Sequence, residues 1–220
     1  MKRSVKLIML TTTALTGCFV LTGTAGVRVL PDAPTTPAAP AAPDELLSNS
    51  SFESPVTDAG NQSPVRPDDW LSFTSGKSDL VMLSNAAAHS GSQSAKFVSQ
   101  AAPSFYQGLS QSIPVKPGTV YQFTAYVQSD PTSPLKGSVT GQLSIEWYDA
   151  NENEIGARQW GTAWGASLSS KGWTKVVLAG LAPSNCAKAH FVVVEKGGGQ
   201  PVAGGVFFVD DASVVKVSQE

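Results

Sequence analysis

The stretches YQFTAYVQ (residues 121–128) and QLSIEWY (residues 142–148) decide the fold class of this chain. In the first stretch, apolar and aromatic residues alternate with Gln and Thr. In the second, Leu143, Ile145 and Trp147 alternate with more polar residues. A period of two residues is typical of a β-strand that has one buried and one exposed face. Both stretches therefore predict half-buried strands.

The chain from residue 46 onward extends this pattern. It carries no sustained helical period, and it contains six further predicted strands, at 79–83, 94–98, 105–113, 173–179, 187–195 and 205–217. Turn signals rich in Gly, Pro and Asn separate the strands, at 116–118, 130–131, 149–151, 183–185 and 197–199. Eight to ten short strands divided by such turns predict one all-β domain over residues 46–220, a two-sheet antiparallel sandwich.

The composition excludes several classes of protein. The chain has 220 residues, with 15 Lys and Arg against 17 Asp and Glu and a formal net charge of −2. Nucleic-acid-binding domains need a basic excess, so we expect no nucleic-acid partner. Two Cys are too few for a disulfide scaffold, and two His argue against a His-rich metal site. We expect Cys186 to be a small buried core residue.

The first 25 residues predict an export signal. Three cations precede an apolar run over residues 7–21, which is shorter than the roughly 20 residues of a membrane-spanning helix. Two processing routes stay open, because LTGC at 15–18 matches a bacterial lipobox with lipid attachment at Cys18, whereas ordinary cleavage near Ala25 would remove that Cys. Residues 26–45 form a Pro/Ala-rich linker, which favours an extended tether. We expect an exported protein, lipid-anchored in a bacterial cell envelope or secreted.

Six short motifs occur in order along residues 46–220. They are NSSFE (49–53), PDDW (67–70), AHSGSQS (88–94), QSIPVKPGTVY (111–121), GWT (172–174) and FVDD (208–211). In this order they resemble the carbohydrate-binding modules of families 4, 9, 16 and 22. The resemblance implies a jelly roll of the galactose-binding-like type. It also implies non-catalytic binding of polysaccharide chains of the β-glucan or xylan class.

The same resemblance implies a structural Ca²⁺ that ties the first strand of the domain to the last. Carried over, its carboxylates are Glu53 and Asp210, and carbonyls near Ser51, Ser92 and Lys96 complete the oxygen shell that Ca²⁺ requires. Alternation along the last strand places Asp210 on a largely apolar face, and a buried carboxylate needs a partner charge. The alternative is that both acids face solvent at a sheet edge.

Binding of a sugar chain requires flat aromatic faces for the pyranose ring, and amides or carboxylates for its hydroxyls. The polar faces of the two stretches quoted first supply both, and we expect them on the concave face of one sheet. A His from 187–195 and two Trp from the Gly/Ala/Ser-rich segment 156–170 join them as candidates. The candidate ligand-binding residues are Tyr126, Gln128, Gln142, Glu146, Tyr148, Trp160, Trp164 and His190. The alternative is an ordinary solvent-facing strand surface with both Trp in the core.

The sequence carries no GxSxG, HExxH or Walker motif, so we expect a protein that is not an enzyme. A glycosidase needs two carboxylates held about 5–9.5 Å apart across a cleft, and the sequence places no such pair. The predicted function is therefore an exported, non-catalytic polysaccharide-binding module. A structural or adhesive cell-surface jelly roll without a sugar ligand is the first alternative, and a small polysaccharide-degrading enzyme is the second. An exposed Trp160 or Trp164 beside Gln142 and Glu146 would argue against the adhesive alternative.

Overall fold

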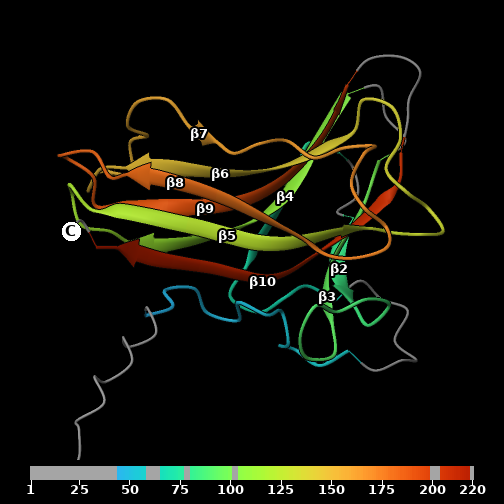
Figure 1. Cartoon of the computed structure of the whole chain (residues 1–220). Coiled ribbons are helices and arrows are strands. Elements are labelled where there is room, and N and C mark those ends of the chain that lie inside the picture. Colours follow the sequence, from blue (N-terminus) through green and yellow to red (C-terminus); the bar gives the residue numbers. More distant parts are fainter. Residues whose placement is uncertain (1–43, 58–64, 77–79, 101–103, 199–203, 219–220) are drawn as a thin grey trace, which may run out of the picture. The chain divides into compact units, whose positions relative to one another are not determined.

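A computed structural model describes residues 44–57, 65–76, 80–100, 104–198 and 204–218. These residues form two antiparallel five-stranded sheets that pack as a sandwich (Figure 1). Sheet A has the strand order β1-β4-β9-β6-β7, and sheet B has the order β2-β3-β10-β5-β8. The strand bounds are Leu71–Thr74 (β1), Val81–Ser84 (β2), Ser94–Val98 (β3), Ser104–Pro114 (β4), Val120–Ser129 (β5), Thr140–Tyr148 (β6), Gln159–Trp160 (β7), Thr174–Leu181 (β8), Lys188–Gly198 (β9) and Val206–Val217 (β10).

The predicted all-β antiparallel sandwich is confirmed, and each of the eight predicted segments overlaps a strand. Sequence reasoning missed β1 and β7, which have four and two residues and are too short to show a period. The turn predicted at 197–199 is wrong for its first two residues, because β9 continues through Gly197 and Gly198 and pairs there with β4. The ring of Phe105 occupies the space that a side chain at position 197 would need, which explains a Gly inside a strand.

The core lies between the two sheets and consists of the apolar faces that the alternation predicted. Phe123 of β5 meets Phe191 of β9 edge to face with ring centroids 5.5 Å apart, and Phe97 stacks on Phe207 at 4.6 Å. Burying each such side chain contributes about 1.5–3 kcal/mol. Cys186 is buried at this core, where burial raises the pKa of its thiol. It is the buried core residue that we expected.

Strand β10 contains a register shift that the sequence pattern did not reveal. Its pairing with β5 shifts between Asp210 and Ser213, and Asp211 has a φ of 44°. An extra residue in one strand turns the following side chains to the opposite face. The core residues of the strand are Phe207, Val209, Ala212 and Val214. Asp210 therefore lies on the outer face of β10 and does not share a face with Ala212 and Val214, as the alternation indicated, whereas its predicted burial is confirmed.

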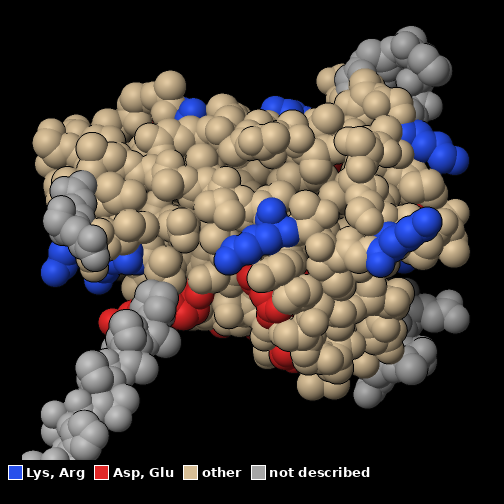
Figure 2. Space-filling view, viewed as in Figure 1, with Lys and Arg blue, Asp and Glu red and all other residues tan. Residues whose placement is uncertain are grey.

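Charged side chains are sparse on this protein, at 15% of all residues. In the view of Figure 2, small groups of Lys, Arg, Asp and Glu are separated by wide uncharged areas. A face of this kind presents no extended field of one sign, so recognition of a partner on it depends on local contacts.

The predictions about the N-terminal segment concern residues that the structure does not describe. The export signal over residues 1–25, the lipid attachment at Cys18 and the linker up to residue 43 lie outside the described residues and stay predictions. Within the described ranges, no apolar helix reaches the length that is needed to cross a bilayer.

Candidate functional site

The outer face of sheet A carries a cleft with a volume of about 590 Å³. Strand β9 runs along its middle, and Val192 and Val194 form an apolar floor, with Ser110 of β4 and Ser144 of β6 beside Val192. These residues alternate with core residues, so the pleat of each strand turns their side chains outward. The hydroxyl of Ser144 is buried and has no hydrogen-bond partner among the described residues.

Exposed aromatic rings stand on both sides of this floor. On the β1–β4 side, Tyr106 is 53% exposed and its ring lies 6.3 Å from that of Phe73. On the opposite side, Trp160 of β7 is 44% exposed and pairs with Ser144 of β6. The two walls thus offer flat apolar faces to a ring-shaped ligand that lies across the floor.

An ion pair between Glu146 and Arg158 lines one part of the cleft. Arg158 Nη1 lies 3.0 Å from Glu146 Oε1, and Arg158 Nε lies 2.8 Å from Glu154 Oε1. Burial raises the pKa of Glu146, and the nearby Arg158 opposes this effect. The charge of the guanidinium is shared by two carboxylates, which holds Glu146 and Arg158 in fixed positions.

Two neutral hydrogen-bonding groups, His190 and Tyr148, also lie next to Glu146. His190 pairs with it across the strands, and the His190 ring lies 4.5 Å from the ring of Tyr148. Burial lowers the pKa of His190, and Lys188 lowers it further, so the imidazole is neutral at pH 7. The Tyr148 hydroxyl donates a hydrogen bond to Glu146 Oε2 at 3.2 Å. Neutral donors and acceptors of this kind suit ligand hydroxyls.

Five of the eight predicted ligand-binding residues share sheet A, namely Gln142, Glu146, Tyr148, Trp160 and His190. Three of them, Glu146, Trp160 and His190, line the cleft directly. Tyr148 contacts His190, and the Gln142 amide donates a hydrogen bond to the carbonyl of Gly161 at 2.6 Å. That bond fixes the segment that follows Trp160.

Tyr126 and Gln128 lie in sheet B, so the expectation that the two quoted stretches share one sheet face is wrong. Their strand β5 pairs with β10 and β8, whereas β6 pairs with β9 and β7. Tyr126 stacks on His89 at 3.7 Å, and the Gln128 amide donates to the carbonyl of Ser170 at 3.1 Å. Alternation identifies the polar face of a strand, but it does not identify the strands that pair with it. That pairing depends on contacts between residues far apart in the chain.

Trp164 belongs to the core, which is the alternative that the sequence left open for it, and it does not line the cleft on sheet A. It is 7% exposed and meets Phe207 edge to face with ring centroids 5.9 Å apart. Its indole occupies the space that a side chain on residue 141 would need, and Gly141 allows this close approach.

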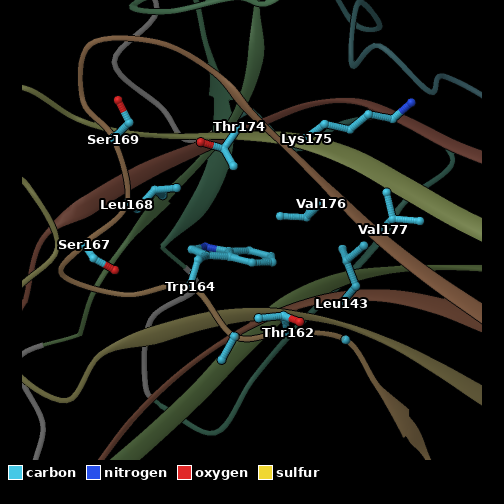
Figure 3. Close-up of a pocket in the computed structure, with 12 residues that line it drawn as sticks. Leu143, Thr162, Trp164, Ser167, Leu168, Ser169, Thr174, Lys175, Val176 and Val177 are labelled. Atoms are coloured by element: carbon cyan, nitrogen blue, oxygen red, sulfur yellow. The ribbon is translucent and has the colours of Figure 1, made fainter.

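A second hollow, of about 520 Å³, lies between β8 and residues 161–169. Figure 3 shows the indole of Trp164 in its middle, with Val176 on one side and Thr162 on the other, while the Lys175 amine points away. The aromatic ring here packs in the core and is only 7% exposed. The cleft on sheet A therefore provides the better arrangement for binding a ring.

Among the aromatic and charged residues that line the cleft, sequence reasoning missed four, namely Phe73, Tyr106, Arg158 and Lys196. A signal existed for Tyr106, because it follows the buried Phe105 in a predicted strand and must face the other way. The remaining three lie outside the strand segments predicted from alternation. Their approach to the cleft depends on how β1, β7 and the end of β9 pair.

The comparison with known protein families decides the identity of the chain. Residues 44–194 match the family described as "Carbohydrate binding domain", of the 4 and 9 type. The chain belongs to this carbohydrate-binding family. The family resemblance found in the sequence motifs is thereby confirmed. The comparison with curated proteins found no match.

Solved structures share the fold of this carbohydrate-binding domain. A xylan-binding domain from Paenibacillus barcinonensis has 16% identity and a TM-score of 0.51, over 81% of this chain and 98% of its own. Modules of an endo-1,4-β-D-xylanase from Clostridium thermocellum, complexed with xylohexaose, have 15% identity and a TM-score of 0.54, over 80% and 29%. The enzymatically active domain of a bacteriophage CBA120 tailspike protein has 13% identity and a TM-score of 0.57, and this chain covers only 21% of it. These likenesses confirm the jelly-roll fold.

The two carboxylates predicted as calcium ligands face the same loop of the domain. Asp210 is fully buried, and its Oδ2 accepts the backbone N–H groups of His89 at 2.6 Å and Ser90 at 3.1 Å. Glu53 Oε1 accepts those of Ser92 at 3.0 Å and Gln93 at 3.1 Å. Burial raises the pKa of Asp210 to about 6, and these N–H donors oppose that effect.

The residues predicted to supply carbonyl ligands lie in different parts of the domain. Ser92 contacts Glu53 directly through its hydroxyl, at 2.7 Å, and the segment next to Ser51 reaches β10 through a bond from Ala212 N–H to the Ser50 carbonyl. Lys96 lies inside β3, between Met82 and Phe208 of the neighbouring strands. The described residues hold no group of three or more acidic, His or Cys side chains arranged around a metal. A cation here would depend on two carboxylates and backbone oxygens.

Proposed function

We propose that the cleft on sheet A binds a polysaccharide chain. The observation that carries this proposal is the pair of exposed rings, Trp160 and Tyr106, on opposite sides of an apolar floor. Membership in the carbohydrate-binding family supports it independently. The sugar rings stack on these aromatic faces. The bound polysaccharide belongs to the β-glucan or xylan class.

The hydroxyls of the bound sugar make hydrogen bonds to the polar end of the cleft. Glu146 is held by Arg158, and His190 is neutral, so both offer fixed groups to an uncharged ligand. Stacking and hydrogen bonding on a preformed surface give modest affinity, because ordering of a flexible chain offsets part of the gain.

A binding role without catalysis fits the charges of the cleft. Among the described residues that line it, Glu146 is the only carboxylate, and Arg158 holds it in an ion pair. Glycosidases use two carboxylates on opposite sides of the scissile bond. The nearby Glu154 binds the same guanidinium and does not line the cleft.

Affinity electrophoresis tests the proposal directly. We expect gels that contain β-glucan or xylan to slow the protein, whereas gels with mannan leave its migration unchanged. The same mixtures are assayed for new reducing ends, and their appearance would contradict a non-catalytic role. A folded sample that migrates alike in every gel would refute binding of the β-glucan or xylan class and favour the adhesive alternative.

We also propose that a structural Ca²⁺ binds between Glu53, Asp210 and the loop of residues 89–93. Ca²⁺ takes six to eight oxygen ligands, and carboxylates with backbone carbonyls are a usual set. Each carboxylate keeps one oxygen, Glu53 Oε2 and Asp210 Oδ1, that accepts a single hydrogen bond and so has a lone pair to spare. Asp211 adds further negative charge beside Glu53.

Removing this cation is expected to lower the melting temperature of the protein by roughly 5–10 °C. A ligand at 100 times its Kd stabilises the folded state by about 2.7 kcal/mol, and in a domain of this size a loss of that free energy lowers the melting temperature by this amount. The measurement is thermal unfolding with EDTA, with CaCl2 restored and with MgCl2 in its place. We expect calcium alone to restore stability, and the Glu53→Gln variant to lose the response. Identical melting curves with EDTA and with CaCl2 would refute the site.

A further inference from the structure

Lys196 occupies a distinctive place in the cleft. In β9 it pairs with Tyr106 of β4 on one side and Thr140 of β6 on the other. Its side chain is exposed, and its Nζ lies 4.4 Å from the centre of the Trp160 ring. The ammonium group therefore lies against the Trp160 wall of the cleft, at the surface where a ligand would rest.

The charge of Lys196 is not neutralised by the residues around it. Arg158, the other cation that lines the cleft, is bound by Glu146 and Glu154. Lys188, at the opposite end of β9, forms an ion pair with Glu152. Lys196 makes no ion pair with any residue in the described ranges. The cleft thus carries one positive charge that no carboxylate of the described protein balances.

A neutral sugar that stacks on the covered face of Trp160 must first displace this ammonium from the indole, and it supplies no charge in return. A carboxylate on the ligand forms a charge-assisted hydrogen bond with the displaced Lys196 and so compensates the lost cation–π contact. The geometry therefore favours an acidic ligand over an otherwise identical neutral one.

We propose that the cleft selects a polysaccharide that carries uronate groups, and that Lys196 binds a uronate carboxylate while an adjacent sugar ring stacks on Trp160. This inference rests on the proposed polysaccharide binding and names its ligand class. The protein as a whole is anionic, with a net charge of −2, so it has no general attraction to polyanions. Selectivity for an acidic chain must come from the local charge, within a Debye length of about 10 Å.

Calorimetric titration with matched ligands tests this inference. The ligands are an unsubstituted xylo-oligosaccharide, one bearing a glucuronate, and the same acidic oligosaccharide with its carboxyl reduced to an alcohol. We expect the acidic ligand to bind about tenfold more tightly than its reduced form, which corresponds to about 1.4 kcal/mol. This ratio should decrease in high salt, because the contact is exposed and electrostatic.

Two lysine variants assign the effect to a residue. Lys196→Met is expected to bring the ratio of the two affinities close to one, because neither ligand then meets an ammonium group beside Trp160. Lys175→Met is the matched control, because Lys175 lies 5.9 Å from the ring of Tyr126 on sheet B and forms a similar pair outside the cleft. This control should retain the full preference for the acidic ligand.

The outcomes separate this inference from the proposed function. Equal binding of the acidic and reduced ligands refutes uronate recognition and leaves polysaccharide binding intact. Loss of neutral and acidic binding together in Lys196→Met also refutes it, because Lys196 would then position Trp160 without sensing charge. If neither these oligosaccharides nor polygalacturonate and alginate bind, the inference and the proposed function both fail.

Discussion

Replacing Trp160 with Ala is expected to weaken polysaccharide binding by about thirtyfold and to leave the fold intact. The indole is 44% exposed and lines the cleft, and buried Trp contacts at binding surfaces often contribute about 2 kcal/mol or more. Its strand has only two residues at the edge of sheet A, paired through Ser144 and Ile145. Truncation removes a stacking face without opening the core. Affinity electrophoresis with circular dichroism as the folding check measures both effects.

Tyr126→Ala is the matched control for this experiment. Tyr126 was predicted from the sequence to bind ligand together with Glu146, but its strand lies in sheet B and its ring stacks on His89. We expect its truncation to leave binding unchanged. If Tyr126→Ala abolishes binding while Trp160→Ala does not, the ligand lies on sheet B and the proposed cleft is wrong.

Glu195 is expected to make the protein less stable as the pH rises. It lies in β9 with its carboxyl fully buried, where it accepts hydrogen bonds from Ser99 Oγ at 2.5 Å and from Gln107 Nε2 at 2.6 Å. Burial raises the pKa of Glu195, and these two donors only partly oppose the shift. Its protonated form is therefore favoured in the folded state.

The sign of the pH effect follows from the protons bound in each state. Below the unfolded pKa of about 4.5, both states carry the proton and the folded state is at its most stable with respect to this group. As the pH rises from there through the raised folded pKa, the unfolded chain releases its proton first, so the free energy of unfolding falls. Above the folded pKa this contribution no longer changes.

Glu195→Gln isolates this contribution from that of other groups. A Gln side chain accepts from Gln107 and donates to Ser99, so it mimics the protonated carboxyl at every pH. We expect urea unfolding at pH 4 to give similar stabilities for both proteins, and at pH 8 to give the variant the higher one. A difference that stays constant between these pH values would show that Glu195 does not titrate in this window.

Glu195→Ala distinguishes the hydrogen bonds from the charge. It leaves Ser99 Oγ without this acceptor and opens a cavity, so we expect a loss of about 2–4 kcal/mol and a melting temperature lower by roughly 10 °C. The loss should be present at pH 4 as well, where the charge plays no part. Equal stability of Glu195→Ala and Glu195→Gln at pH 4 would contradict a structural role for the two hydrogen bonds.

Local pattern alone was enough to predict eight of the ten strands that the structure describes. Residues such as Phe123 and Ile145 are core residues because the pleat turns every second side chain inward, and this depends only on neighbours in the chain. The motif order likewise indicated the carbohydrate-binding family, which the match over residues 44–194 confirms. The same alternation along the strands identified Glu146 and His190 as outward-facing residues.

Only the tertiary structure decided which outward-facing residues form a site. Tyr126 and Glu146 have equivalent places in their strands, yet β5 joins sheet B and β6 joins sheet A, so their side chains face opposite sides of the sandwich. The register shift in β10 put Asp210 and Ala212 on opposite faces of the strand, and the pairing of β9 with β4 brought Lys196 beside Tyr106. The sequence by itself determined eight of the ten described strands, most of their inward and outward faces, and the family. Which strands pair, and in which register, depends on contacts between residues far apart in the chain. These contacts exist only once the two sheets have formed.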